Sequence, residues 1–213
     1  MSDRYHAEGA EAEFEPGSRN RVIHNLLGIR SVREMQNRES IALMTATQQA
    51  IDATTADHRF KSQDIRRLHG NWLGEIYPWA GSYRTVNMSK DGFPFAAAGQ
   101  IERLMGELER GPLQDFTPCR FTEHGAQAKA LAVVHAELTL VHPFRDGNGR
   151  CSRMLATLMA LQAGLPPLDF SGSHGKEKQR YIAAIHKALE RDYEPMTEVF
   201  GRVIARTIRA DSA

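Results

Sequence analysis

The sequence predicts an all-α fold, a helical bundle that carries one small β-hairpin. Most of the chain after Ser31 has apolar residues at helical spacing, and capping residues mark the ends of these stretches. One stretch alternates instead and contains an Asp-Gly turn, which is typical of a hairpin. The 213 residues fit one domain with a short extension. We therefore expect an N-terminal extension over 1–30 and the main domain over 31–213.

The first 30 residues show no helical apolar periodicity. Acidic residues gather at Glu8, Glu11, Glu13 and Glu15, which favours a solvated tail. An apolar patch over 22–29 follows and could dock on the main body.

Ser31 and Glu34 open the first helix as a capping box, in which each side chain satisfies an amide of the other residue. This helix is expected to run to about Thr54. The second helix begins at Ser62 or Asp64 and ends at Pro78, and a third covers 100–109. The second helix has one apolar stripe, formed by Ile65, Leu68, Trp72 and Ile76.

The remaining helices are expected at 122–141, 148–163, 174–190 and 195–209. The helix over 122–141 has one apolar face, formed by Leu131, Val134, Leu138 and Val141. Gly164 is expected to end the next helix in a left-handed conformation.

The hairpin is predicted between the second and third helices. Residues 82–88 alternate and form its first strand, Lys90-Asp91-Gly92 is the turn, and Phe93-Pro94-Phe95 is the return strand. Pro94 cannot donate to a ladder, so the return strand is expected at a sheet edge.

Composition limits the classes of partner. Lys and Arg number 27 and Asp and Glu 26, which argues against binding nucleic acid or a membrane by bulk charge. No run of about 18 apolar residues predicts a transmembrane helix. The cysteines, Cys119 and Cys151, lack metal-site spacing and indicate a reducing, cytoplasmic setting, with a disulfide between them as the minor alternative.

The chemistry is concentrated in His142-Pro143-Phe144-Arg145-Asp146-Gly147-Asn148-Gly149-Arg150, followed two residues later by Arg153. Pro143 biases His142 away from the helical region, so the long helix ends there. Gly147 and Gly149 permit close approach of a ligand to the backbone. The run then enters a helix N-terminus, whose free N–H groups favour an anion.

The side chains of this run match phosphoryl or nucleotidyl transfer. Arg150 and Arg153 lie three residues apart and can both bind phosphate oxygens. Asp146 is a hard oxygen ligand of the kind that Mg²⁺ prefers, and His142 can take up a proton near neutral pH. Phe144 is interpreted as an apolar peg that holds the loop against the core.

The run resembles the signature of the Fic (Fic/Doc-type) family, His-x-Phe-x-Asp/Glu-Gly-Asn-Gly-Arg-x-x-Arg, at every specified position. The resemblance covers about 31–210. It implies a Fic-type helical bundle with a small β-hairpin flap over the active site. It also implies a protein adenylyltransferase, which transfers AMP from Mg-ATP to a Ser, Thr or Tyr hydroxyl of a target protein and releases pyrophosphate.

The resemblance also implies residue roles. His142 would be the general base and Asp146 the Mg²⁺ ligand. Gly147, Asn148 and Gly149 would form the anion hole, with Arg150 and Arg153 as clamps on the outer phosphates. The flap residues Met88, Ser89, Asp91, Gly92, Phe93 and Pro94 would align the target backbone by strand addition. Tyr181 would line the adenine pocket. Lys90 would contact phosphate or target, or serve as a plain surface lysine.

Several alternatives stay open. Gly149 favours AMP transfer over the kinase version, but UMP or phosphocholine transfer, phosphorylation or removal of AMP would use the same fold, and a non-catalytic nucleotide-binding module is a further alternative. His135, seven residues before His142, is either a structural histidine, the favoured interpretation, or a metal ligand. The target protein and any homo-oligomer are not specified by the sequence.

The sequence predicts no built-in inhibitor of the family's Ser/Thr-x-x-x-Glu-Gly/Asn type. Glu177 follows Ser173 at the required spacing, but Lys178 stands where Gly or Asn is needed. The resemblance then implies a toxin-like protein whose Arg153 is free or is held by a separate antitoxin-like protein.

Overall fold

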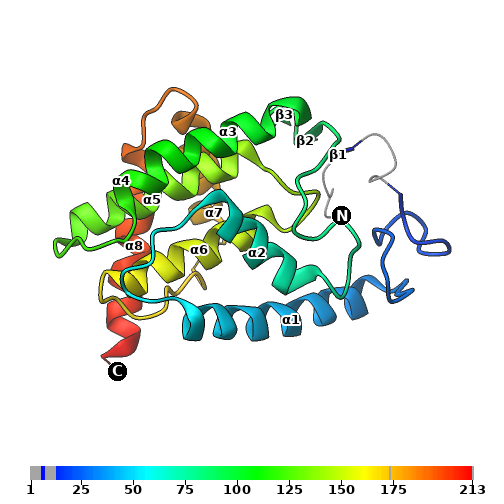
Figure 1. The fold of residues 1–213 in the computed structure, drawn as a ribbon, viewed down its shortest axis with the longest axis horizontal. Coiled ribbons are helices and arrows are strands. Elements are labelled where there is room, and N and C mark those ends of the chain that lie inside the picture. Colours follow the sequence, from blue (N-terminus) through cyan, green and yellow to red (C-terminus); the bar gives the residue numbers. More distant parts are fainter. Residues whose placement is uncertain (1–5, 8–12, 173, 213) are drawn as a thin grey trace. The chain divides into compact units, whose positions relative to one another are not determined.

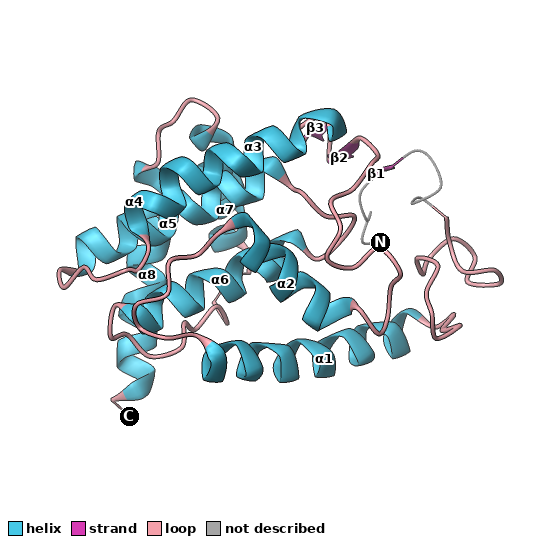
Figure 2. Ribbon diagram, in the orientation of Figure 1, coloured by secondary structure: helices cyan, strands magenta, loops and turns pink. Residues whose placement is uncertain are grey.

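The computed structural model describes the backbone of residues 6–7 and the chain over 13–172 and 174–212. Helices dominate it, as the sequence predicts, and three short strands accompany them (Figures 1 and 2). The helices are α1 (Val32–Ala53), α2 (Ser62–Leu73), α3 (Ile101–Leu108), α4 (Gln114–Phe116), α5 (His124–Val141), α6 (Asn148–Gln162), α7 (Lys176–Ala188) and α8 (Glu194–Asp211). The strands are β1 (His6–Ala7), β2 (Met88–Lys90) and β3 (Phe93–Pro94).

The chain divides into two compact units. The first comprises residues 1–53, 62–105 and 141–151, and the second comprises 54–61, 106–140 and 152–213. The boundary between them passes through α6, after its first turn. We describe each unit by itself.

In the first unit α1 runs beside α2 (Figure 1). Ser31 caps α1, because its Oγ accepts a hydrogen bond of 3.4 Å from the Glu34 amide. All four members of the apolar stripe predicted for α2 are buried. The helix itself ends earlier than expected, at Leu73 rather than near Pro78, and turns lead from there to Pro78.

The sheet is antiparallel with strand order β1-β2-β3. Asp91 and Gly92 form the predicted turn with φ values of 51° and 80°, and Pro94 lies on an edge strand as expected. The first strand is much shorter than predicted. Residues 82–87 are irregular, because the Arg84 amide donates to the Pro143 carbonyl at 2.8 Å instead of joining a ladder.

In the second unit α5 is buried on all sides over 130–134 rather than on the single face that the sequence predicts. A helix that is apolar all round is typical of a central core position. α7 and α8 pack against each other (Figure 1), and Gly164 ends α6 with a φ of 76°, as predicted. The third predicted helix is expected to end before Gly111-Pro112. Instead, a π-helical turn over Glu109–Leu113 follows α3 and continues into α4.

Of the two acidic tail residues that the structure describes, Glu13 is exposed, as expected for a solvated tail, and Glu15 is buried, which contradicts that expectation. Glu15 is 8% exposed and accepts hydrogen bonds from His24 Nδ1 at 3.0 Å and from the Asn25 amide at 3.3 Å. Val22 and Ile23 are buried, as expected for a docking patch, whereas Leu26 and Leu27 of the same patch are exposed. Glu8 and Glu11 lie outside the described residues. In the described part of the chain, no helix has the length and apolar character needed to cross a membrane.

Candidate active site

The sequence motif forms the connection between α5 and α6. His142 directly follows α5 and adopts a φ of 52°, a left-handed conformation that residues with a Cβ atom rarely take. Its side chain is 2% exposed, and the ring stacks on Phe95 with a centroid distance of 3.6 Å. The predicted base therefore lies directly against the end of the hairpin.

Gly147 is required by its surroundings. Its φ is 82°, and a Cβ atom at this position would lie 2.7 Å from Cζ3 of Trp72 and 3.3 Å from Nε2 of His69. The loop backbone thus packs directly on these two α2 side chains. At Gly149, by contrast, a Cβ would meet nothing within 4 Å, so this glycine borders open space.

His69 supports the loop from α2, and the sequence alone did not reveal this role. Its Nδ1 accepts a hydrogen bond from the Gly81 amide at 2.9 Å, so the proton is on Nε2, which donates to the Asp146 carbonyl at 3.0 Å. Burial lowers the pKa of His69 to about 4, which keeps the ring neutral. The available signal was its position, next to the apolar stripe of the second predicted helix.

Phe144 is the apolar peg that the sequence predicts. It is fully buried and stacks on His69 at 3.8 Å between ring centroids. Asn148 closes the same turn, because its Oδ1 accepts from the Phe144 amide at 2.8 Å and its Nδ2 donates to the Phe144 carbonyl at 2.7 Å. The Asn148 side chain therefore shapes the loop.

Asp146 fits the Mg²⁺ ligand that the resemblance implies. Its carboxyl group accepts the Gly147 amide at 2.6 Å and lies 3.6 Å from Nη2 of Arg150. Over residues 13–172 and 174–212, no three His, Cys, Asp or Glu side chains gather into a metal cluster. One carboxylate suits Mg²⁺ that arrives with nucleotide phosphates, because this ion keeps several waters and takes few protein ligands.

Arg150 is held by a glutamate that the sequence did not single out. Its Nη1 donates to Oε2 of Glu39 in α1 at 2.7 Å, and its guanidinium lies 4.5 Å from the Trp72 ring centroid. Burial disfavours its charge, but Asp146 and Glu39 raise the pKa of Arg150 above its usual value. Glu39 follows the buried Met35 by four residues and so lies on the same face of the helix. A charged residue at this position of the apolar face was the sequence signal that could have indicated a buried ion pair.

The flap residues differ in exposure. Lys90, Asp91, Gly92 and Pro94 are exposed, Ser89 and Phe93 are partly exposed, and the Met88 side chain is buried. One edge of β2 pairs with β3 and the other with β1, in the register His6 with Ser89 and Ala7 with Met88. The sequence did not predict that β1, a segment of the same chain, would cover the outer edge of β2.

Arg153 and Tyr181 belong to the second unit. The Tyr181 hydroxyl lies 2.9 Å from Nε2 of His135, and burial raises the pKa of Tyr181. His135 is 2% exposed and packs edge-on against Phe200, which supports the interpretation of His135 as a structural histidine. The Arg153 guanidinium lies 5.9 Å from the Phe170 ring centroid.

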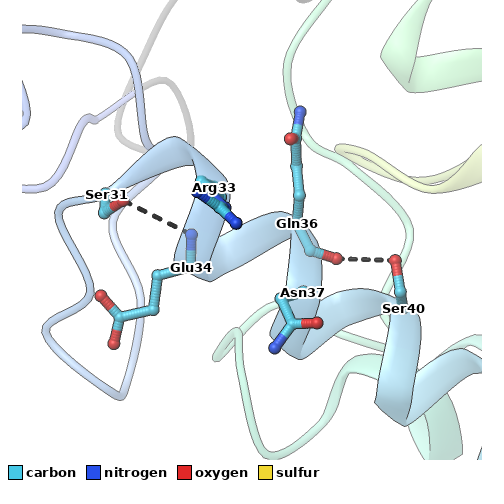
Figure 3. Close-up of a pocket in the computed structure, with 6 residues that line it drawn as sticks. All are labelled: Ser31, Arg33, Glu34, Gln36, Asn37 and Ser40. Atoms are coloured by element: carbon cyan, nitrogen blue, oxygen red, sulfur yellow. Dashed lines mark hydrogen bonds between the residues drawn. The ribbon is translucent and has the colours of Figure 1, made fainter.

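A separate surface pocket lies on the first turns of α1 (Figure 3). It is lined by polar residues of one helix start, namely Ser31, Arg33, Glu34, Gln36, Asn37 and Ser40. None of the motif residues contributes to it. The cysteines are both free and buried, so the disulfide alternative is wrong.

Comparisons with known proteins agree with the motif. The family model described as Fic/DOC family matches residues 59–160. "Protein adenylyltransferase VbhT" of Bartonella schoenbuchensis is 29% identical over 143 residues, which are 67% of this chain and 30% of that protein. "Probable protein adenylyltransferase Fic" of Escherichia coli K12 is 27% identical over 212 residues, 96% of this chain and 97% of that protein.

The fold is shared with solved structures as well. The BepC protein of Bartonella tribocorum, solved with bound AMPPNP, aligns with a TM-score of 0.71 at 24% identity, over 85% of this chain and 91% of that one. The chain spans less than half the length of several of the curated relatives, 30% for the Bartonella schoenbuchensis protein and 40% for the one from Culex quinquefasciatus.

Proposed function

We propose that this chain, whose residues 59–160 match the Fic/DOC family model, is a protein adenylyltransferase that transfers AMP from ATP to a hydroxyl side chain of a target protein. The observation that carries the proposal is the complete motif, with His142 directly before a loop that enters the N-terminus of α6. The relatives named above as adenylyltransferases, and the nucleotide analogue bound to the BepC protein, support it.

In the proposed reaction His142 takes the proton from the target hydroxyl. The hydroxyl oxygen then forms a bond to the α-phosphorus of ATP, and the bond from that phosphorus to the bridging oxygen of the β-phosphate breaks. Pyrophosphate leaves with the electron pair, and the target carries AMP. A positioned base of this kind contributes about 10²–10⁴-fold to a rate.

The loop would stabilise the phosphates. The backbone N–H groups at the start of α6, at Asn148 and Gly149, lie at the positive end of the helix dipole, where an anion binds a helix start. Arg150 and Arg153 would bind the outer phosphates, with Glu39 and Trp72 holding the Arg150 guanidinium. Asp146 would hold Mg²⁺, which supplies charge neutralisation for the phosphates when it is bound. Tyr181 would line the base pocket.

The flap would align the target. An extended hairpin binds main chain by strand addition, and Lys90, Asp91, Gly92 and Pro94 are exposed for this purpose, with Ser89 and Phe93 beside them. Met88 would contribute backbone only, because its side chain is buried, and would do so after β1 is displaced, because Ala7 pairs with it.

Restraint of the activity is also part of the proposal. We infer a toxin-like protein of the cytoplasm that is held by a separate antitoxin-like protein, since the sequence has no Ser/Thr-x-x-x-Glu-Gly/Asn inhibitor. The structure describes neither Ser173 nor a partner. A homo-oligomer is compatible with this scheme, whereas nucleic acid or membrane binding by bulk charge is not expected at a net charge of +1.

The test uses ATP labelled at either the α- or the γ-phosphate, with Mg²⁺ and a cell lysate as the source of targets. Label from the α position should enter protein with the wild type and be lost with His142→Ala. His186→Ala, at an exposed histidine of α7, is the matched control and should retain transfer. Transfer of γ label alone would replace this proposal by phosphorylation. Nucleotide binding without any transfer would favour the non-catalytic module.

A further inference from the structure

Arg84 is a buried arginine that the motif does not contain. It lies between α2 and the hairpin and is 3% exposed. An arginine this buried needs acceptors for its guanidinium, because burial of an uncompensated charge is strongly unfavourable. The acceptors found for Arg84 are backbone carbonyls, and they come from two places.

The first set lies in the His142 turn. Arg84 donates to three successive carbonyls there, from Nη2 to Val141 at 3.4 Å, from Nε to His142 at 2.8 Å and from its own amide to Pro143 at 2.8 Å. These carbonyls lie at the last residue of α5 and directly after it, where a helix leaves its last acceptors without helical partners. His142 also has the left-handed conformation that side-chain-bearing residues disfavour. Arg84 therefore holds an otherwise unfavourable turn.

The second set lies at the two ends of the hairpin. Arg84 Nη1 donates to the Val86 carbonyl at 2.5 Å, just before β2, and Nη2 donates to the Ala96 carbonyl at 2.6 Å, just after β3. One guanidinium thus joins both bases of the flap to the turn that carries His142. The Phe95 ring, just after β3, also stacks on the His142 ring with a centroid distance of 3.6 Å. The flap and the His142 turn are therefore joined by side chains as well as through backbone carbonyls.

We propose that Arg84 is a positioning residue, which fixes the His142 imidazole relative to the flap and so relative to the hydroxyl of a target docked there. The inference rests on the proposed function for its catalytic consequence, but the structural link can be measured without activity. Lysine cannot replace arginine here, because an ammonium is one compact donor group whereas the guanidinium is a planar fork of five N–H donors.

The first measurement uses the wild-type protein. The Arg84 Nε–H should exchange slowly with D₂O, because it is buried and bonded to the His142 carbonyl. The His142 ring resonances should be shifted by the Phe95 ring current, and Phe95→Leu should remove that shift and so assign the signal. Rapid exchange of the Nε–H, or ring resonances that Phe95→Leu leaves in place, would overturn the proposal even if no variant of Arg84 folds.

The second measurement uses Arg84→Lys. We expect at least a tenfold fall in the rate of α-label transfer at saturating ATP, an ATP Kd within twofold of wild type, and a moved His142 resonance. Arg66→Lys is the matched control, since Arg66 Nε also donates to a backbone carbonyl, that of Gly81, at 3.0 Å. Its rate of α-label transfer should be within twofold of the wild-type rate.

The outcomes separate the two proposals. Wild-type protein that transfers no AMP would remove the proposed function, while the exchange and resonance data would still decide the role of Arg84. A folded Arg84→Lys protein with wild-type transfer and an unmoved His142 resonance would show that Arg84 does not position the base.

Discussion

Glu39 Oε2 lies 2.7 Å from Nη1 of Arg150, so a glutamate of α1 holds an arginine 111 positions further along the chain. The Tyr77 hydroxyl donates to the other oxygen of the same carboxylate at 2.7 Å, and Glu39 is 1% exposed. The carboxylate is therefore fully engaged on one side by a phenol and on the other by a motif cation. This pairing links α1 to the candidate phosphate site.

Removal of the Glu39 charge should destabilise the protein. Glu39→Gln removes the charged acceptor of the partly exposed Arg150 guanidinium, which costs about 1.5–3 kcal/mol. Urea unfolding followed by circular dichroism measures this loss. Glu75→Gln is the control, because its exposed pair with Arg38 should contribute less than about 1 kcal/mol. Equal effects of the two substitutions would contradict the assignment of Glu39 as a buried anchor.

Gly147→Ala should be poorly tolerated. The added methyl group would lie 2.7 Å from Trp72 at a φ of 82°, so both packing and backbone conformation oppose it, at a cost of about 1–3 kcal/mol. We also expect ATP binding to fall by more than tenfold in calorimetry, since the loop must shift. Gly201→Ala, in α8 with open space around it, should instead be neutral or stabilising by up to about 1 kcal/mol.

His135 should make stability depend on pH. Burial, with a smaller contribution from Arg153, lowers the pKa of His135 from 6.5 to about 3. The unfolded chain takes up this proton below pH 6.5 while the folded protein does not, so stability is complete above that pH and falls as the pH drops toward 3. The slope for one group is about 1.4 kcal/mol per pH step.

His135→Gln should reduce the pH dependence of the unfolding free energy by up to about 1.4 kcal/mol per pH unit between about pH 6 and pH 4. Urea unfolding midpoints measured at several pH values across this range test this expectation. His186→Gln, at an exposed position of α7, should leave the pH dependence as in the wild type. A slope that persists unchanged in His135→Gln would mean that other groups produce the acid sensitivity.

Removal of β1 should expose a second edge of the flap. His6 and Ala7 pair with Ser89 and Met88, on the strand that the proposed target would extend. A variant that lacks residues 1–12 should therefore modify targets several-fold faster, with automodification and lysate labelling as the readouts. Ala7→Pro is the milder form, because proline removes a backbone donor. Unchanged or slower labelling in both variants would indicate that β1 does not compete with a target.

Local sequence signals succeeded where neighbours in the chain decide the structure. The Asp91-Gly92 turn, the Ser31 cap and the Gly164 helix end each depend on a few adjacent residues, and all three were predicted. Failures came where distant residues compete. The segment 82–87 alternates like a strand, yet the Arg84 amide bonds to Pro143, 59 positions away, and no periodicity reports such a partner.

The candidate site divides in the same way. Residue type and order alone predict the candidate chemistry, because His142, Asp146, Gly147 and the two arginines stand in one short run before a helix start. The tertiary structure decided how that run is held, through His69 beneath the loop, Glu39 on Arg150 and Arg84 across the His142 turn. These supports come from other elements of the first unit, and their partners are backbone groups or single charges. Such contacts depend on where the chain folds back, so residue type and spacing alone do not encode them.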